Sequence, residues 1–181
     1  MRIASVAPMA ALTMGLGLAM PAAAETAAEI DAGVRTAMDA CNTSVPGCGV
    51  AAKEADGILV FPGITKGAIG IGGSFGEGAL RVGDKTDGYY NSASASIGFQ
   101  LGAEKYTQVI MFMTKEALDA FLATSGWEVG VNAKVTMIDQ GNSAGITSII
   151  AENDVLGFLY GQKGLMGDFS IQGAKITKID R

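Results

Sequence analysis

The 181-residue sequence contains no histidine, and it has only two cysteines and one tryptophan. The absence of histidine excludes Ser–His–Asp and Cys–His catalysis and removes the commonest metal ligand in proteins. The acid–base candidates that remain each adjoin a turn or a polar segment; they are Glu77, Glu104, Glu128 and Asp168. We therefore expect no catalytic residues, no metal site and no cofactor, and a carboxylate-based enzyme is the remote alternative.

Basic residues are also scarce. The chain has 13 lysines and arginines against 18 acids, which gives a formal net charge of −5. Nucleic acid is a poor partner for such a chain, because its phosphates require a basic surface. Bulk attraction to anionic lipid headgroups is equally weak. Any binding to a phospholipid or a membrane surface therefore needs a local basic patch or an apolar pocket.

A long apolar run occurs only at the N-terminus. Arg2 precedes an apolar stretch from Ile3 to Met20, and Ala22–Ala24 forms an A-x-A site before Glu25. This pattern predicts a secretory signal peptide over residues 1–24. A retained membrane anchor is the alternative, and Pro21 argues against it. We expect an exported, periplasmic protein that can lie peripherally on a membrane.

The two cysteines, Cys41 and Cys48, both follow this leader and flank Pro46–Gly47. Oxidation is expected in an exported chain, so this pair predicts a structural disulfide around a short turn. A redox pair would need C-x-x-C spacing, and the spacing does not suggest a zinc site.

The N-terminal part after the leader has a helical period. Residues 26–40 carry one apolar face made of Ile30, Val34, Ala37, Met38 and Cys41. A second short helix is expected over residues 50–55. Residues 25–56 should therefore form a helical hairpin that packs on a β-rich body, residues 57–181, in one domain.

Strand patterns dominate that body. Ile58–Phe61 is a short apolar strand that should stop at Pro62, and the glycine-rich segment 67–78 should allow strands to bend. Segment 94–101 alternates, with Ala95, Ile97, Phe99 and Leu101 on its apolar face. Residues 109–113 form another strand, and Thr114 caps a helix that ends at Ser125–Gly126. Further strands are expected at 127–131, 133–138, 145–150, 155–160 and 168–178.

These elements predict an α+β fold. We expect an antiparallel, glycine-rich sheet system, sandwich- or barrel-like, with an N-terminal helical hairpin and one further helix.

Five motifs carry a family resemblance: GILVFP (57–62), GEGAL (76–80), YYN (89–91), GWEVG (126–130) and the run from Gly161 to Ile179. In this order they resemble the SYLF family, also called the Ysc84-type domain, over about Ala51 to Ile179. The resemblance implies lipid binding, best known in eukaryotic members that bind phosphoinositides and influence actin. Secreted bacterial members look like envelope proteins.

Three lysines are the candidate headgroup ligands. Lys66, Lys105 and Lys163 each stand near a glycine turn and an apolar run. Independent, solvated lysines are the alternative. Two apolar pairs, Tyr89–Tyr90 and Leu165–Met166, could form exposed tips that enter a membrane interface, and core burial is the alternative for them.

The sequence therefore predicts a non-catalytic periplasmic protein of the cell envelope. It would bind anionic lipid through a local lysine patch or an apolar pocket. An envelope structural or protein-interaction module without a lipid ligand is the alternative.

Overall fold

The computed structural model describes residues 24–138, 145–164, 171 and 173–181. Its elements, in order, are α1 (Ala27–Ser44), α2 (Cys48–Glu54), β1 (Gly57–Val82), β2 (Lys85–Phe112), α3 (Lys115–Leu122), β3 (Trp127–Glu128), β4 (Thr136–Ile138), α4 (Ile146–Glu152), β5 (Val155–Gly164) and β6 (Lys175–Ile179). The fold is α+β, as predicted.

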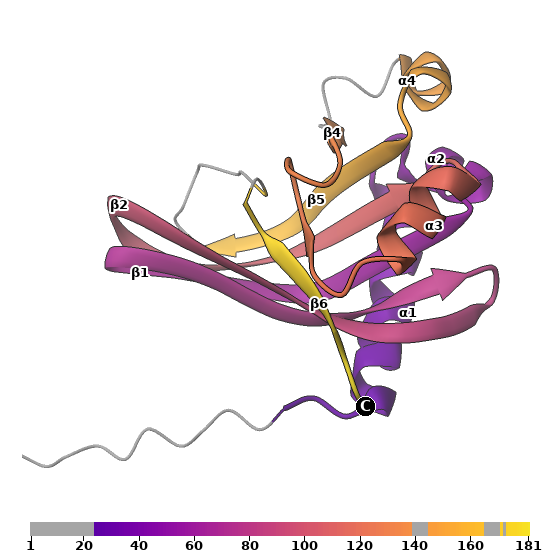
Figure 1. Ribbon diagram of the computed structural model, residues 1–181. Helices are drawn as coiled ribbons and strands as arrows, with labels where there is room; N and C mark the ends of the chain where they lie inside the picture. Colours follow the sequence, from indigo (N-terminus) through magenta and orange to yellow (C-terminus); the bar gives the residue numbers. More distant parts are fainter. Residues whose placement is uncertain (1–23, 139–144, 165–170, 172) are drawn as a thin grey trace, which may run out of the picture.

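One curled sheet, with six strands among the described residues, forms the centre of the molecule (Figure 1). The long strand β2 pairs along one edge with β1. Its other edge is shared by β6, at Tyr89–Ala93, and by β5, at Glu104–Phe112. These pairings are antiparallel, and β4 runs parallel to β5. The sheet is therefore mainly antiparallel and partly closed, in line with the expected barrel-like curvature.

The β1–β2 hairpin bends back on itself near its middle, where the register shifts between Ile69 and Ile71. The two arms of β1 then cross at close range. A Cβ added at Gly78 would lie 2.1 Å from the carbonyl oxygen of Val60, and one added at Gly76 would lie 2.8 Å from Cγ1 of Ile64. Glycine at these positions thus allows one backbone to approach another, which confirms the structural reading of this glycine-rich segment.

The sheet has an apolar core on each face. Helices α1 and α2 pack on one face; the buried side chains of this core include Ile30, Val34, Cys41, Val60, Val109, Met111, Leu156 and Phe158. Helix α3 and the segment around β3 pack on the other; its buried side chains include Leu59, Phe61, Ile110, Phe112, Leu118, Phe121 and Trp127. The apolar run Ile58–Phe61 contributes to both cores, as expected for a buried strand.

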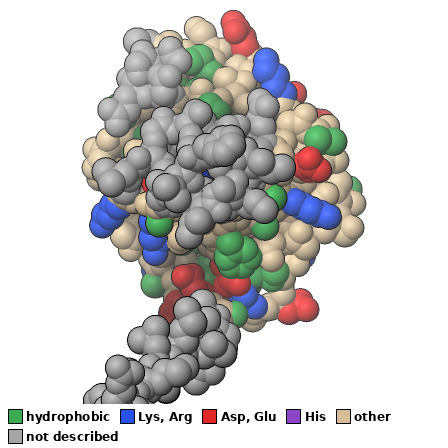
Figure 2. Space-filling view, turned by 90° about the vertical axis from the view of Figure 1, so that its left-hand side faces the viewer, with side chains coloured by type: hydrophobic (Ala, Val, Ile, Leu, Met, Phe, Trp, Pro, Cys, Tyr) green, Lys and Arg blue, Asp and Glu red, His purple; other side chains and the backbone are tan. Residues whose placement is uncertain are grey.

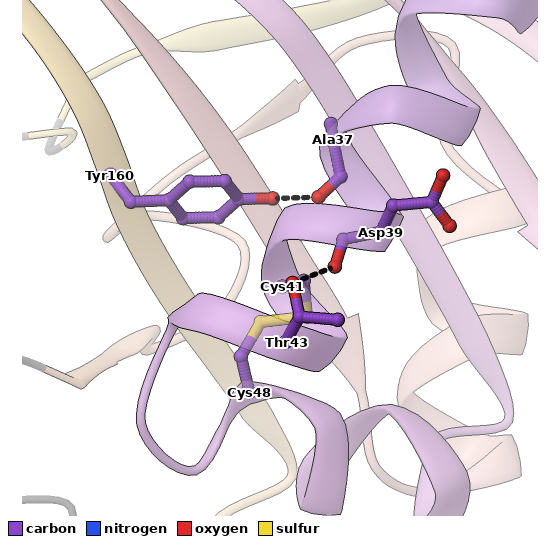
Figure 3. Close-up of a disulfide and its surroundings, with 6 residues drawn as sticks. All are labelled: Ala37, Asp39, Cys41, Thr43, Cys48 and Tyr160. Atoms are coloured by element: carbon purple, nitrogen blue, oxygen red, sulfur yellow. Dashed lines mark hydrogen bonds between the residues drawn. A yellow bond between two sulfur atoms is a disulfide. The ribbon is translucent and has the colours of Figure 1, made fainter.

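The N-terminal helical hairpin is confirmed. Thr26 and Glu29 form a capping box at the start of α1. Cys41 and Cys48 are disulfide-bonded, with their Cα atoms 5.2 Å apart. The hydroxyl of Tyr160, on β5, donates a 2.7 Å hydrogen bond to the carbonyl of Ala37 and so ties α1 to the sheet (Figure 3).

The helix after β2 is also confirmed. Thr114 caps α3 by accepting a hydrogen bond from the backbone of Ala117. The ring of Trp127 packs 5.6 Å from that of Phe121, at the C-terminal end of the helix. Every helix in the described part of the chain is too short or too polar to cross a bilayer.

Pro62 does not stop the first strand, contrary to the prediction. β1 continues through it to Val82, with a register shift between Phe61 and Ile64. Proline is tolerated because β1 pairs on only one side among the described strands and the irregularity removes the need for its N–H. The Thr107 hydroxyl donates a 3.1 Å hydrogen bond to the Pro62 carbonyl.

The strand expected at 145–150 is wrong, because this segment is part of helix α4. The described residues therefore form two helices beyond the hairpin rather than one. Ile146, Ile149 and Ile150 follow helical spacing and pack against the core beneath α1 and α2. Their β-branched side chains favour a strand locally, but the packing of one partly buried helical face against this core favours the helix.

The strand expected at 155–160 is confirmed and continues to Gly164 in β5, whereas three others differ from their predicted ranges. β3 and β4 cover only parts of 127–131 and 133–138, and β6 begins at Lys175. Segment 94–101 lies within β2, but Ala95 is exposed instead of facing a core. The side chains of Ile97, Phe99 and Leu101 lie outside those that the structure describes.

Candidate functional site

Two of the three predicted lysines meet on the sheet. Lys105, on β2, stands directly opposite Lys163 on β5, and Thr65 on β1 stands opposite Lys105 on the other side. Cross-strand partners in a sheet point to the same face, so these three side chains share one face. Both lysines are exposed. Tertiary structure thus brings together cations that are far apart in the sequence.

Lys66 belongs to the other face. It is paired with Glu104 in the β1–β2 register, one position away from Lys105. Because successive strand residues point to opposite faces, Lys66 cannot join Lys105 and Lys163 in one patch. The Glu104 side chain is only 3% exposed. Burial raises the pKa of its carboxyl, and the positive charge of Lys66 partly opposes this shift.

An exposed aromatic ring lies in a groove that Lys105 also lines. Phe75, on the returning arm of β1, is 50% exposed and lines the same surface groove of about 740 Å³ as Thr65 and Lys105. The stem of Lys105 lies across Gly63, because a Cβ there would be 2.6 Å from its Cε atom. Sequence reasoning missed Phe75, although glycines close on either side of it are a signal of an accessible ring.

Two acids line this groove: Glu25 is exposed, and Glu77 is paired. Glu77 also lines it, and its carboxylate forms an ion pair with Arg181 at the C-terminus. The backbone N–H of Glu25 donates a 3.2 Å hydrogen bond to the other carboxylate oxygen of Glu77. Figure 1 shows the C-terminus close to the start of α1. The groove therefore lies where the start and the end of the described chain meet.

We define the Lys105 surface as Thr65, Phe75, Lys105 and Lys163. It lies toward the bent end of the β1–β2 hairpin, beyond the N-terminus of α1. Figure 2 faces this end of the molecule and shows basic and hydrophobic side chains exposed together on it. An exposed ring beside basic groups can insert into the apolar side of an interface while the cations stay in water.

The two tyrosines do not form an exposed tip. Tyr90 is buried in the core, where its ring packs 5.1 Å from that of Phe121. Tyr89 is half-buried, and its hydroxyl donates a 3.1 Å hydrogen bond to the carboxylate of Asp31 on α1. The second predicted tip, Leu165 and Met166, lies outside the described residues.

Comparison with known proteins gives a family match for the C-terminal half of the chain. The model of the Ysc84 family, described as Las17-binding protein actin regulator, matches residues 93–181. No curated protein gives a significant match to the chain. The matched region starts within β2, later than the Ala51 expected from the motifs, and it includes both Lys105 and Lys163. Through residues 93–181, this chain belongs to the Ysc84 (SYLF) family.

Proposed function

We propose that this protein is a non-catalytic lipid-binding protein of the bacterial periplasm, and that it docks on anionic membranes through the Lys105 surface. The observation that carries the proposal is the direct cross-strand pairing of Lys105 with Lys163, together with the half-exposed Phe75 in the groove that Lys105 lines. Family membership supports an interaction module. The pattern of residues 1–24 supports export.

Charge explains why such a site must be local. The chain is acidic overall, with a net charge of −5, so its long-range field opposes an anionic surface. A lysine close to such a surface contributes about 1 kcal/mol to the binding free energy. This contribution falls off over about one Debye length from the surface. Two lysines and one ring therefore predict weak, salt-sensitive docking at the membrane surface, in which no part of the protein beyond the ring enters the bilayer.

Vesicle co-sedimentation tests the proposal. Vesicles of phosphatidylglycerol mixed with phosphatidylcholine should bind the protein at low salt, and pure phosphatidylcholine should bind it much less. The double variant Lys105→Gln/Lys163→Gln should lose most of this binding and most of its salt dependence. Phe75→Ser should weaken binding while its salt dependence remains.

Two control variants test whether binding depends on this site or on the loss of any lysine. Lys66→Gln changes a lysine on the opposite face, and Lys85→Gln/Lys134→Gln removes two exposed lysines that are not part of the Lys105 surface. Both should bind nearly as well as the unchanged protein. Unchanged vesicle binding by a folded Lys105→Gln/Lys163→Gln variant would refute the proposal. It would leave an apolar ligand site or a protein-interaction role as the better account.

A further inference from the structure

A second groove lies between the helical hairpin and the sheet. It has a volume of about 740 Å³ and is bounded by the C-terminal half of α1, by α2, and by the turn that joins β1 to β2. None of its lining residues belongs to the Lys105 surface. We call it the hairpin groove. Its volume falls within the range of about 300–1,000 Å³ typical of small-molecule sites.

Part of the lining of the hairpin groove is apolar, and we call this part its floor. It is formed by Met38, Val45, Val50, Ala52 and Ile58. Val50 is 48% exposed, which leaves an aliphatic side chain open to solvent inside a concave surface. Apolar surface bordered by polar groups is typical of ligand grooves.

The rim carries more cations than acids. Arg35 on α1, Lys53 on α2 and Arg81 on β1 line the groove, against the two carboxylates of Asp39 and Asp84. Arg81 is held in place, because its Nη2 donates a 2.7 Å hydrogen bond to the carbonyl of Asp84. Its other guanidinium donors remain available, and they suit a carboxylate or a phosphate. This excess of cations lies within a chain of net negative charge.

We propose that the hairpin groove binds single-chain amphiphiles with an anionic head, such as a long-chain carboxylate or an alkyl phosphate. The alkyl chain lies on the floor around Val50, and the head lies among Arg35, Lys53 and Arg81. The proposal rests on the proposed function in its choice of a lipid-like ligand, and on separate residues for its site. It predicts binding of dissolved monomers, without a membrane surface.

The disulfide supports one wall of the groove. Val45 and Gly47 lie in the turn closed by Cys41 and Cys48, and the two cysteines are fully buried. Gly47 adopts a left-handed conformation with φ of 77°. The disulfide thus limits how far this wall can move, and a rigid wall lowers the entropic cost of binding.

The test uses dansyl-labelled undecanoic acid below its critical micelle concentration. Its fluorescence should rise on binding to the intact, oxidised protein. Dodecanoate and dodecyl phosphate should both displace it, whereas dodecanol and dodecyltrimethylammonium should compete at least about fivefold less well. A clear preference between carboxylate and phosphate would identify which head the cations favour. Equal competition by the cationic amphiphile would overturn the proposal.

Variants locate the site. Arg35→Gln/Lys53→Gln should weaken binding of the probe about fivefold to tenfold, and Val50→Asp should weaken it at least about tenfold. These three side chains are exposed, so the variants should fold. The matched controls are Lys85→Gln/Lys134→Gln and Val131→Asp, since Val131 is 72% exposed and lies outside the groove. They should bind the probe normally.

The two sites can fail separately. Lys105→Gln/Lys163→Gln should lose vesicle binding but keep probe binding. Val50→Asp should lose probe binding but keep vesicle binding. Unchanged probe binding in both Val50→Asp and Arg35→Gln/Lys53→Gln would disprove the hairpin groove site and leave the Lys105 surface untouched. No detectable probe binding by the intact protein would disprove it as well.

Discussion

At the scale of single residues, Gly78 shows how tightly the two arms of β1 pack. A methyl group there would lie 2.1 Å from the Val60 carbonyl oxygen, closer than any real contact. Gly78→Ala should lower the free energy of unfolding by about 3 kcal/mol, because backbone must move to make room. Urea denaturation measures this loss.

Gly126→Ala is its control. A Cβ at Gly126 would meet only the flexible end of the Lys175 side chain, 3.0 Å away at Cε. Gly126→Ala should lower the free energy of unfolding by less than about 1 kcal/mol. Equal losses in the two variants would argue against a close crossing of the arms.

Glu104 is a buried carboxyl whose Oε2 atom has no hydrogen-bond partner among the described residues. Burial raises the pKa of Glu104, so its ionised form is less stable in the folded state than in the unfolded chain. The folded state is thus favoured at acid pH, and this contribution is lost as the pH rises through the raised pKa. At neutral pH the buried Glu104 carboxyl therefore lowers stability.

Glu104→Gln should accordingly increase the free energy of unfolding at neutral pH. The gain should shrink as the pH falls from the raised pKa toward about 4, the ordinary pKa of glutamate, and it should be gone below that pH, where the folded and unfolded states are both protonated. Urea denaturation across this pH range measures it, with the exposed Glu54→Gln as control. A gain that grows toward acid pH would contradict the assignment.

At the scale of elements, the disulfide joins the two helices of the hairpin. A loop of this length should contribute about 2–3 kcal/mol in the loop-entropy view. Reduction should lower the free energy of unfolding by that amount, and the variant Cys41→Ala/Cys48→Ala should be insensitive to reductant. Thiol labelling of the unfolded, unreduced protein should detect no free cysteine. Two labelled thiols would refute the pairing in the isolated protein.

At the scale of the whole molecule, Glu77 joins the two ends of the described chain. Its carboxylate pairs with Arg181 and accepts the hydrogen bond from the backbone of Glu25. The Glu77 side chain is only 8% exposed. Glu77→Gln should therefore lower the free energy of unfolding by about 1–2 kcal/mol, since it leaves a partly buried arginine without its charge partner. The exposed pair Lys115–Asp119 is the comparison, and Asp119→Asn should cost less than about 1 kcal/mol.

Removal of residues 1–24 would add a charge at this junction. We expect the exported protein to begin at Glu25, and its new α-ammonium would form where the backbone N–H now lies 3.2 Å from Oε2 of Glu77. N-terminal sequencing of the periplasmic fraction checks the cleavage. Recovery of the intact N-terminus in the membrane fraction would contradict both the cleavage and the periplasmic location.

Local patterns were sufficient for much of the fold. The apolar face of α1, the cap at Thr114 and the cysteine pair around Pro46–Gly47 each depend on residues close in sequence. Such features depend on helical period, on hydrogen bonds to nearby backbone groups and on short loop closure. The sequence alone therefore predicted the helical hairpin, α3 and the α+β class.

Long-range packing decided the rest. Pro62 remains inside β1 and the segment at Ile146 becomes a helix because of partners distant in sequence. The site follows the same rule: all three lysines were identified from the sequence, but strand register placed Lys105 beside Lys163 and Lys66 on the other face. Local patterns indicated which lysines are candidates. Which of these lysines lie together depends on register, because a shift of one residue along a strand reverses the face that a side chain occupies.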